Sequence, residues 1–154
     1  MKLFYACIAL ILLISSCSQK ASENQVFTQR IIATGNTLEE IRFEPDSFSI
    51  PSGASVKINL VNQSEYQSMF HNMVICTFGK TSEIGFKGIQ AGKKNDFVPP
   101  NNANVLANST VINPGDSTHF NFMAPAPGKF SYVCTFPGHY SIMQGVLTIN
   151  VKWD

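Results

Sequence analysis

Apolar and polar residues alternate along much of the chain in short stretches, without the longer period of a helix. The clearest stretch is 55–61, where Val56, Ile58 and Leu60 alternate with Lys57 and Asn59. A period of two places the two sets of side chains on opposite faces of a β-strand. Segments of this kind, rich in Val, Ile, Phe and Thr, predict strands at 29–34, 43–50, 55–61, 72–77, 105–111, 117–123, 129–135 and 144–152.

Turn residues separate the predicted strands. Pro-Ser-Gly at 51–53, Asn-Pro-Gly-Asp at 113–116 and Pro-Ala-Pro-Gly at 125–128 each mark a reversal of the chain. About eight short strands at this spacing predict an all-β fold, a Greek-key sandwich or barrel. Segment 78–104 is too long and polar for a simple turn. A short helical flap is expected over 78–104, with its helix near 82–90, although Gly85 and Gly88 weaken a helix.

The first residues have the pattern of an export signal. Lys2 precedes an uncharged, mostly apolar run at 3–16, which is too short to span a membrane as a helix. Ile14-Ser15-Ser16-Cys17 resembles a bacterial lipobox, which implies cleavage before Cys17 and acylation of that cysteine. The alternative is ordinary cleavage near Ser16, which would leave Cys17 a simple thiol.

The expected division is therefore a lipoprotein signal peptide at 1–16, a lipidated Cys17 and tether at 17–28, and one domain at 29–154. Two or three acyl chains anchor a protein stably to a bilayer. We expect a membrane-anchored protein in the periplasm or on the cell surface, with its fold in water.

Composition narrows the functional class. The 154 residues are enough for one domain, and only 14% of them are charged. This low charge argues against nucleic-acid binding, which usually requires a basic face. Loss of Lys2 with the signal leaves ten basic and ten acidic residues, so net charge would not steer a partner strongly.

Potential metal ligands gather near the C-terminus. Cys134, His139 and Met143 follow one another at intervals of five and four residues, in a loop closed by Pro137-Gly138. A second imidazole is available from His71 or His119. Two histidines, one cysteine and a weakly bound methionine are the ligands of a blue-copper electron-transfer site. The competing interpretation is a structural Cys76–Cys134 disulfide in an immunoglobulin-like sandwich. Such domains place a buried Trp between the two cysteines, but Trp153 lies outside that interval.

Two segments resemble azurin, a cupredoxin. Cys-Thr-Phe-Pro-Gly-His at 134–139 with Met143 is similar to the copper loop, and His71-Asn72 before an apolar strand is similar to the upstream ligand segment. The resemblance extends from about residue 29 to residue 152. It implies equatorial copper ligands at His71, Cys134 and His139, an axial ligand at Met143, and a weak axial oxygen from the Phe70 carbonyl.

The resemblance also implies roles around the metal. Asn72 would tie the His71 segment to the Cys134 loop, Phe136 and Pro137 would shield the ion, and the edge of His139 would be the electron port. The sequence departs from azurins at Phe70, where they usually carry Gly, and in lacking a partner for their N-terminal disulfide. Cys76 is expected to be a lone thiol, because residues 71 and 76 face opposite sides of a regular strand.

The resulting prediction is a monomeric blue-copper protein that binds one copper ion and shuttles single electrons. Its partners would be exported redox proteins such as cytochromes, reductases or oxidases. An enzyme is not expected, because the sequence has no further His cluster for a second copper. The alternative is a copper-binding or copper-delivery lipoprotein without electron transfer, a class that usually uses exposed Met and His clusters.

Overall fold

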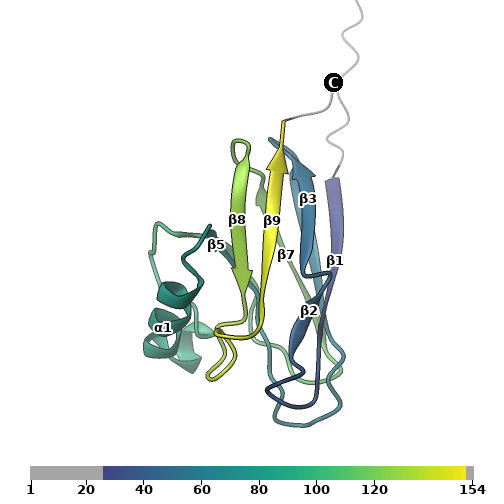
Figure 1. The fold of residues 1–154 in the computed structure, drawn as a ribbon, viewed down its shortest axis with the longest axis vertical. Helices are drawn as coiled ribbons and strands as arrows, with labels where there is room; N and C mark the ends of the chain where they lie inside the picture. The colour runs from purple at the N-terminus through teal and green to yellow at the C-terminus, as the bar shows by residue number, and fades with distance from the viewer. Residues whose placement is uncertain (1–25, 152–154) are drawn as a thin grey trace, which may run out of the picture.

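The structure is a computed structural model that describes residues 26–151 (Figure 1). The predicted signal peptide and Cys17 lie outside these residues. Within the described part, nine strands form two sheets, with one α-helix and one 3-10 helix, which confirms the predicted all-β fold. The strands are β1 (Val26–Thr34), β2 (Arg42–Glu44), β3 (Ser47–Pro51), β4 (Ser55–Asn62), β5 (Val74–Thr77), β6 (Val105–Asn108), β7 (Ser117–Met123), β8 (Gly128–Val133) and β9 (Gln144–Asn150). The helices are α1 (Thr81–Ala91) and η1 (Lys93–Asn95).

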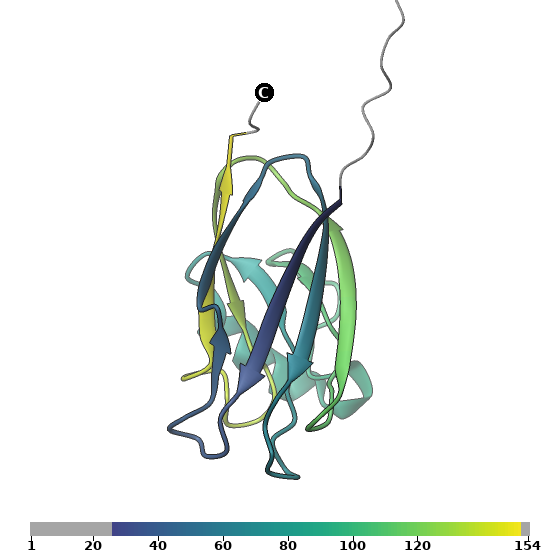
Figure 2. The same cartoon turned by 90° about the vertical axis from the view of Figure 1, so that its right-hand side faces the viewer.

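The two sheets face each other as a sandwich (Figure 2). One has the strand order β2-β1-β4-β7, and the other has the order β3-β9-β8-β5-β6. Both are mixed, because β1 runs parallel to β4 and β3 runs parallel to β9, while the other pairs are antiparallel. Alternation within a strand gives no information on the direction of its neighbour, so the sequence did not predict these parallel pairs.

The predicted strand at 43–50 is two strands. The chain leaves β2 at Glu44, passes Pro45 and Asp46, and enters β3 at Ser47 in the other sheet. Proline has no N–H to donate to a ladder, so a strand is readily interrupted there. Strand β1 begins at Val26, and residues 26–28 of the expected tether pair with Ser55–Lys57 of β4.

The inner faces of the sheets form the main core. Val56, Ile58 and Leu60 of β4 are all fully buried, as their alternation predicts. Tyr132 of β8 packs its ring edge-on against Phe43 at 5.4 Å between centroids. Its hydroxyl donates a 2.8 Å hydrogen bond to the Pro45 carbonyl, so it ties the second sheet to the crossing point between β2 and β3.

The predicted flap is present and packs closely against the second sheet. Helix α1 covers a small cluster made of Val74, Cys76, Ile84 and Val133. A Cβ on Gly85 would collide with the Tyr140 ring, and one on Gly88 would collide with the Phe97 carbonyl oxygen. The two glycines therefore let the helix approach neighbouring segments closely, which accounts for their presence in a helix.

The two chain ends of the described part lie at one end of the sandwich, and several connecting segments lie at the other (Figure 1). They include the segments that join β1 to β2, β4 to β5, β6 to β7 and β8 to β9. None of the helices in residues 26–151 is both long and apolar enough to cross a bilayer.

Candidate metal centre

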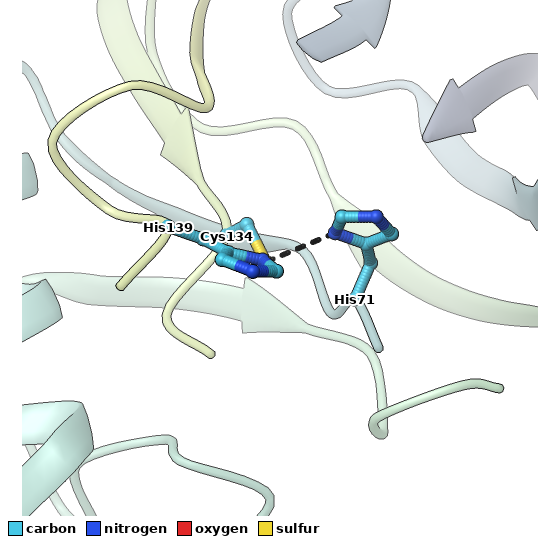
Figure 3. Close-up of side chains that lie close together, drawn as sticks. All are labelled: His71, Cys134 and His139. Carbon is cyan, nitrogen blue, oxygen red and sulfur yellow. Dashed lines mark hydrogen bonds between the residues drawn. The ribbon is translucent and has the colours of Figure 1, made fainter. Parts of the chain in front are cut away.

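Three predicted ligands lie together at the end of the sandwich remote from the chain ends. The Sγ of Cys134 is 3.7 Å from the Nδ1 of His71 and 3.6 Å from the Nδ1 of His139. The three side chains converge from two separate loops (Figure 3). Their potential ligand atoms all lie within 4.8 Å of one another, and at most 3% of each residue is exposed. The fold thus brings His71 next to Cys134 and His139, although His71 is distant from them in the sequence.

The loop after β8 holds two of the three ligands. Cys134 follows the last residue of β8, and its N–H donates to the Met143 carbonyl at 3.0 Å. Between them the chain turns at Gly138, whose φ of +88° is unfavourable for residues with a side chain. The Met143 N–H then donates to the His139 carbonyl at 2.8 Å. These bonds make the loop compact and bring His139 back towards Cys134, while Met143 is fully buried.

His71 stands on the other wall of the site. The strand predicted at 72–77 is β5, which begins at Val74 instead of residue 72. His71 lies before this strand and forms an isolated antiparallel bridge with Ile112. Two backbone hydrogen bonds of 3.2 and 2.8 Å hold this bridge. The Nδ1 of His71 faces Cys134, and its Nε2 lies 3.2 Å from the hydroxyl of Ser64. Both sides of this imidazole are therefore in contact with the protein.

Asn72 connects three parts of the molecule. Its Oδ1 accepts a 2.8 Å hydrogen bond from the N–H of Thr135, and its Nδ2 donates to the Thr135 hydroxyl at 2.8 Å. The same Nδ2 donates to the Asp96 carbonyl at 2.7 Å. Asn72 is fully buried, so it fixes the His71 segment, the Cys134 loop and the flap relative to one another.

Three phenylalanine rings cluster next to His139. The Phe136 ring is 5.1 Å from the His139 ring, 5.3 Å from Phe97 and 5.6 Å from Phe70, measured between centroids. Phe136 is partly buried, whereas Pro137, which the resemblance also assigns to shielding, is exposed. The position of the Phe70 carbonyl relative to a bound ion stays a prediction.

Burial sets the protonation of the metal-free site. It lowers the pKa of His71 from 6.5 to about 3, and the neighbouring His139 adds to this shift. Burial also lowers the pKa of His139 to about 4. The pKa of the Cys134 thiol rises to about 12 through burial, opposed by hydrogen bonds from the backbone N–H groups of Asn72 and Phe136. At neutral pH the site therefore presents two neutral imidazoles and a thiol, and a metal ion has one proton to displace.

The two histidines differ at their outer nitrogens. Among the described residues, the Nε2 of His139 has no hydrogen-bond partner, yet no fully buried side-chain nitrogen or oxygen there lacks one. The Nε2 of His139 must therefore reach solvent, although only 3% of the residue is exposed. The third histidine, His119, is exposed on β7 and outside the cluster.

The cysteines of the described part are both free. Cys134 points to the two histidines, while Cys76 is buried between the second sheet and α1. The alternative disulfide between Cys76 and Cys134 is therefore absent, and Cys76 is the lone thiol that strand alternation predicts. Burial raises the pKa of Cys76 to about 11, which keeps it protonated.

The residues present fit a bound copper ion. Bonds of roughly 2.0–2.1 Å to nitrogen and 2.3 Å to sulfur, as found around zinc, place a nitrogen and a sulfur ligand about 3.5–3.8 Å apart at tetrahedral to trigonal angles. The two observed separations from the Cys134 sulfur are 3.7 and 3.6 Å. Two imidazoles and a thiolate suit both oxidation states of copper, because sulfur favours Cu(I) and nitrogen favours Cu(II).

Sequence reasoning missed the supporting contacts of Ser64, Asp96 and Thr135. Ser64 and Asp96 are common loop residues with no distinctive spacing to the ligands. The one available signal was Thr135, which lies inside the loop motif itself. Ser64 and Asp96 reach the site only because the segments after β4 and α1 are folded over it.

Comparisons with known proteins agree with this geometry. Residues 29–150 match the family described as "Copper binding proteins, plastocyanin/azurin family". The chain is 33% identical to Auracyanin-A of Chloroflexus aurantiacus over 121 residues, covering 77% of this chain and 74% of that protein. It is 28% identical to Azurin iso-2 of Methylomonas sp. over 125 residues, covering 77% of this chain and 95% of the relative.

Solved structures show the same similarity. The structure of auracyanin A, titled a "blue" copper protein from Chloroflexus aurantiacus, aligns with a TM-score of 0.74 at 30% identity. This alignment covers 82% of the present chain and all of the other. The family match covers residues 29–150 and includes all three clustered ligands, so the chain belongs to the plastocyanin/azurin family of copper-binding proteins.

Proposed function

We propose that the protein is a blue-copper electron carrier that passes single electrons between exported redox partners while a lipid at Cys17 holds it on a membrane. The observation that carries the proposal is the buried cluster of His71, Cys134 and His139, held in place by the surrounding hydrogen bonds. Copper in such a site supplies one-electron chemistry by alternating between Cu(I) and Cu(II). The protein's residues hold the ligands in place, so that little of the site has to rearrange when the copper changes oxidation state.

The framework around the ligands is suited to electron transfer without rearrangement. Asn72 fixes the distance between the His71 segment and the Cys134 loop. The backbone N–H groups of Asn72 and Phe136 donate to the Cys134 sulfur and stabilise its thiolate. With the strong ligand positions filled by side chains, no position remains for a substrate, which is why we propose a carrier and not an enzyme.

His139 is the proposed route for the electron. Its outer nitrogen reaches solvent while its Nδ1 faces the cluster. Two exposed apolar residues lie near His139 in the fold. Ile142 belongs to the same loop, and the side chain of Leu38 lies opposite Gly138. Such a surface suits brief contact with a cytochrome, a reductase or an oxidase, and we propose that the carrier works as a monomer.

The burial of the site argues against the copper-delivery alternative. A delivery protein has to release its metal to a partner, so its ligands must be reachable. Here His71 and Cys134 are fully buried and His139 is only 3% exposed. Metal held in this way exchanges slowly, which favours a resident cofactor.

Met143 is the proposed axial ligand. Replacing it with leucine keeps the three strong ligands, so the blue colour should remain. The reduction potential should rise, because the axial ligand tunes the potential and loss of a weak donor disfavours Cu(II). A redox titration followed by visible absorption measures the shift. Met123→Leu is the matched control, because Met123 is 61% exposed at the far end of β7. Equal potentials in Met143→Leu and the wild type would remove Met143 from the ligand set.

The tether places the carrier on a membrane of the periplasm or the cell surface. The fold supports this proposal, because β1 begins at the end of the sandwich remote from the metal centre (Figure 1). Attachment of the chain to a membrane at a point before β1 would therefore leave His139 accessible to partners.

Cys17→Ser is expected to move the protein from the membrane fraction to the soluble fraction, because the acyl chains attach at that cysteine. Fractionation of cells followed by immunoblotting measures the distribution. Cys7→Ser, within the expected signal peptide, is the control and should stay with the membrane. If Cys17→Ser also stays with the membrane, the lipid anchor is not at Cys17.

A further inference from the structure

The outer nitrogen of His71 ends on a serine that no metal-ligand pattern would identify. The Nε2 of His71 lies 3.2 Å from the Oγ of Ser64. His71 is fully buried, and only 4% of Ser64 is exposed, so water does not compete strongly for this contact. On its other side, the imidazole turns Nδ1 towards Cys134 at 3.7 Å.

Ser64 is itself held by a buried amide. Asn62, the last residue of β4, accepts a 3.0 Å hydrogen bond from the Ser64 N–H through its Oδ1. Its Nδ2 donates to the Met69 carbonyl at 2.7 Å. Asn62 therefore forms hydrogen bonds near both ends of the segment 63–69 and fixes the backbone that carries the Ser64 hydroxyl.

A neutral imidazole has one N–H, and the partner of that N–H determines which nitrogen is left to bind a metal. Of the two nitrogens, only Nε2 faces a hydroxyl oxygen, which can accept a hydrogen bond. With the N–H on Nε2, the Ser64 hydroxyl accepts it and the lone pair of Nδ1 points to the cluster.

We propose that Ser64 is a positioning residue for His71: its Oγ accepts the Nε2 hydrogen, selects the tautomer that binds through Nδ1, and orients the ring towards Cys134. The effect on redox behaviour rests on the function proposed above, whereas the tautomer is a property of the metal-free protein. His139 has no such partner among the described residues, so the two imidazoles are supported unequally.

The same contact tunes the metal. Accepting a hydrogen from Nε2 makes the imidazole a stronger donor, and a stronger nitrogen donor favours Cu(II) over the softer Cu(I). Loss of an outer-shell partner typically costs 10–100-fold in metal affinity. Ser64→Ala should therefore weaken Cu(II) binding about 10-fold relative to Cu(I). This tenfold difference raises a one-electron potential by about 59 mV.

The test uses the full chain in detergent, with Ser64→Ala, Ser64→Thr and Ser68→Ala. Threonine retains the hydroxyl, and Ser68 is an exposed serine of the same segment, so Ser68→Ala is the control. Nitrogen-15 NMR of the metal-free proteins reports the His71 tautomer, and redox titration of the copper-loaded proteins reports the potential. We expect Ser64→Ala to show a mixture of His71 tautomers and a higher reduction potential than the wild type. Ser64→Thr should keep the wild-type tautomer and the wild-type potential.

Two results would overturn the proposal. One is a wild-type His71 that carries its hydrogen on Nδ1, a measurement that needs no variant to fold. The other is a Ser64→Ala protein that matches Ser68→Ala in His71 tautomer and in reduction potential. If only its thermal stability has fallen, Ser64 supports the fold and does not position His71. A wild-type protein that fails to cycle copper reversibly would contradict the proposed function and leave the tautomer result intact.

Discussion

Replacement of Cys134 by alanine is expected to abolish the blue colour completely. The absorption of such a site comes from charge transfer between a cysteine thiolate and Cu(II), and Cys134 is the sulfur that faces both histidines. Copper affinity should fall by at least about 100-fold, because loss of an outer-shell contact alone costs 10–100-fold. Visible absorption and a competition titration with a copper chelator measure the two effects.

Cys76→Ala is the matched control for that experiment. Cys76 and Cys134 are both fully buried free thiols, so each variant removes a buried sulfur of the same size. Only Cys134 belongs to the cluster of potential ligands. Cys76→Ala should therefore remain blue with wild-type copper affinity. A blue Cys134→Ala variant, or a colourless Cys76→Ala variant that is still folded, would show that the ligand has been misassigned.

Asn72→Ala is expected to cause the largest loss of stability among the residues around the site. The substitution leaves the N–H of Thr135 and the carbonyl of Asp96 without the partners they have in the native structure. A buried group left unpaired costs about 1–3 kcal/mol, and the part-buried Asp96 carbonyl costs less than the buried N–H of Thr135. The free energy of unfolding of the metal-free protein should fall by about 3 kcal/mol. For a domain of this size the Tm should drop by about 10 °C.

Asn121→Ala is the control, because Asn121 is an exposed asparagine on β7. Its Tm should stay within about 2 °C of the wild type, as is usual for surface substitutions. Thermal unfolding followed by circular dichroism compares the two variants. Equal Tm values would mean that Asn72 does not hold the His71 segment, the Cys134 loop and the flap together.

The sequence predicted the sheets best where one face is buried and the other is not. The alternation in 55–61 and 117–123 corresponds to β4 and β7, which pair with each other and bury Ile58 and Phe120 at the same register. The strand predicted at 43–50 is divided at Pro45, and its pattern did not indicate that the chain changes sheets there. Parallel pairing was beyond prediction, because it depends on contacts distant along the chain.

Cys134 and His139 were predictable because copper chemistry demands particular residue types at short spacing in one loop, whereas the choice of His71 over His119 came from the resemblance to azurin. The contacts that support the ligands were not predictable, since a hydroxyl or a carbonyl can come from almost any residue. Ser64 and Asp96 are examples, because only the folded loops bring them to His71 and Asn72. Gly85 and Gly88, which weaken an isolated helix, proved to be necessary for close packing of α1.

The most direct test of the electron-carrier proposal is a titration of the purified, metal-free protein with Cu(II), followed by visible absorption and EPR. We expect an intense blue band that saturates at one equivalent, with narrow copper hyperfine splitting. Ascorbate should bleach the band, and a mild oxidant should restore it without loss of metal. A weakly coloured complex with wide hyperfine splitting, or copper released on reduction, would contradict a blue-copper carrier built on His71, Cys134 and His139.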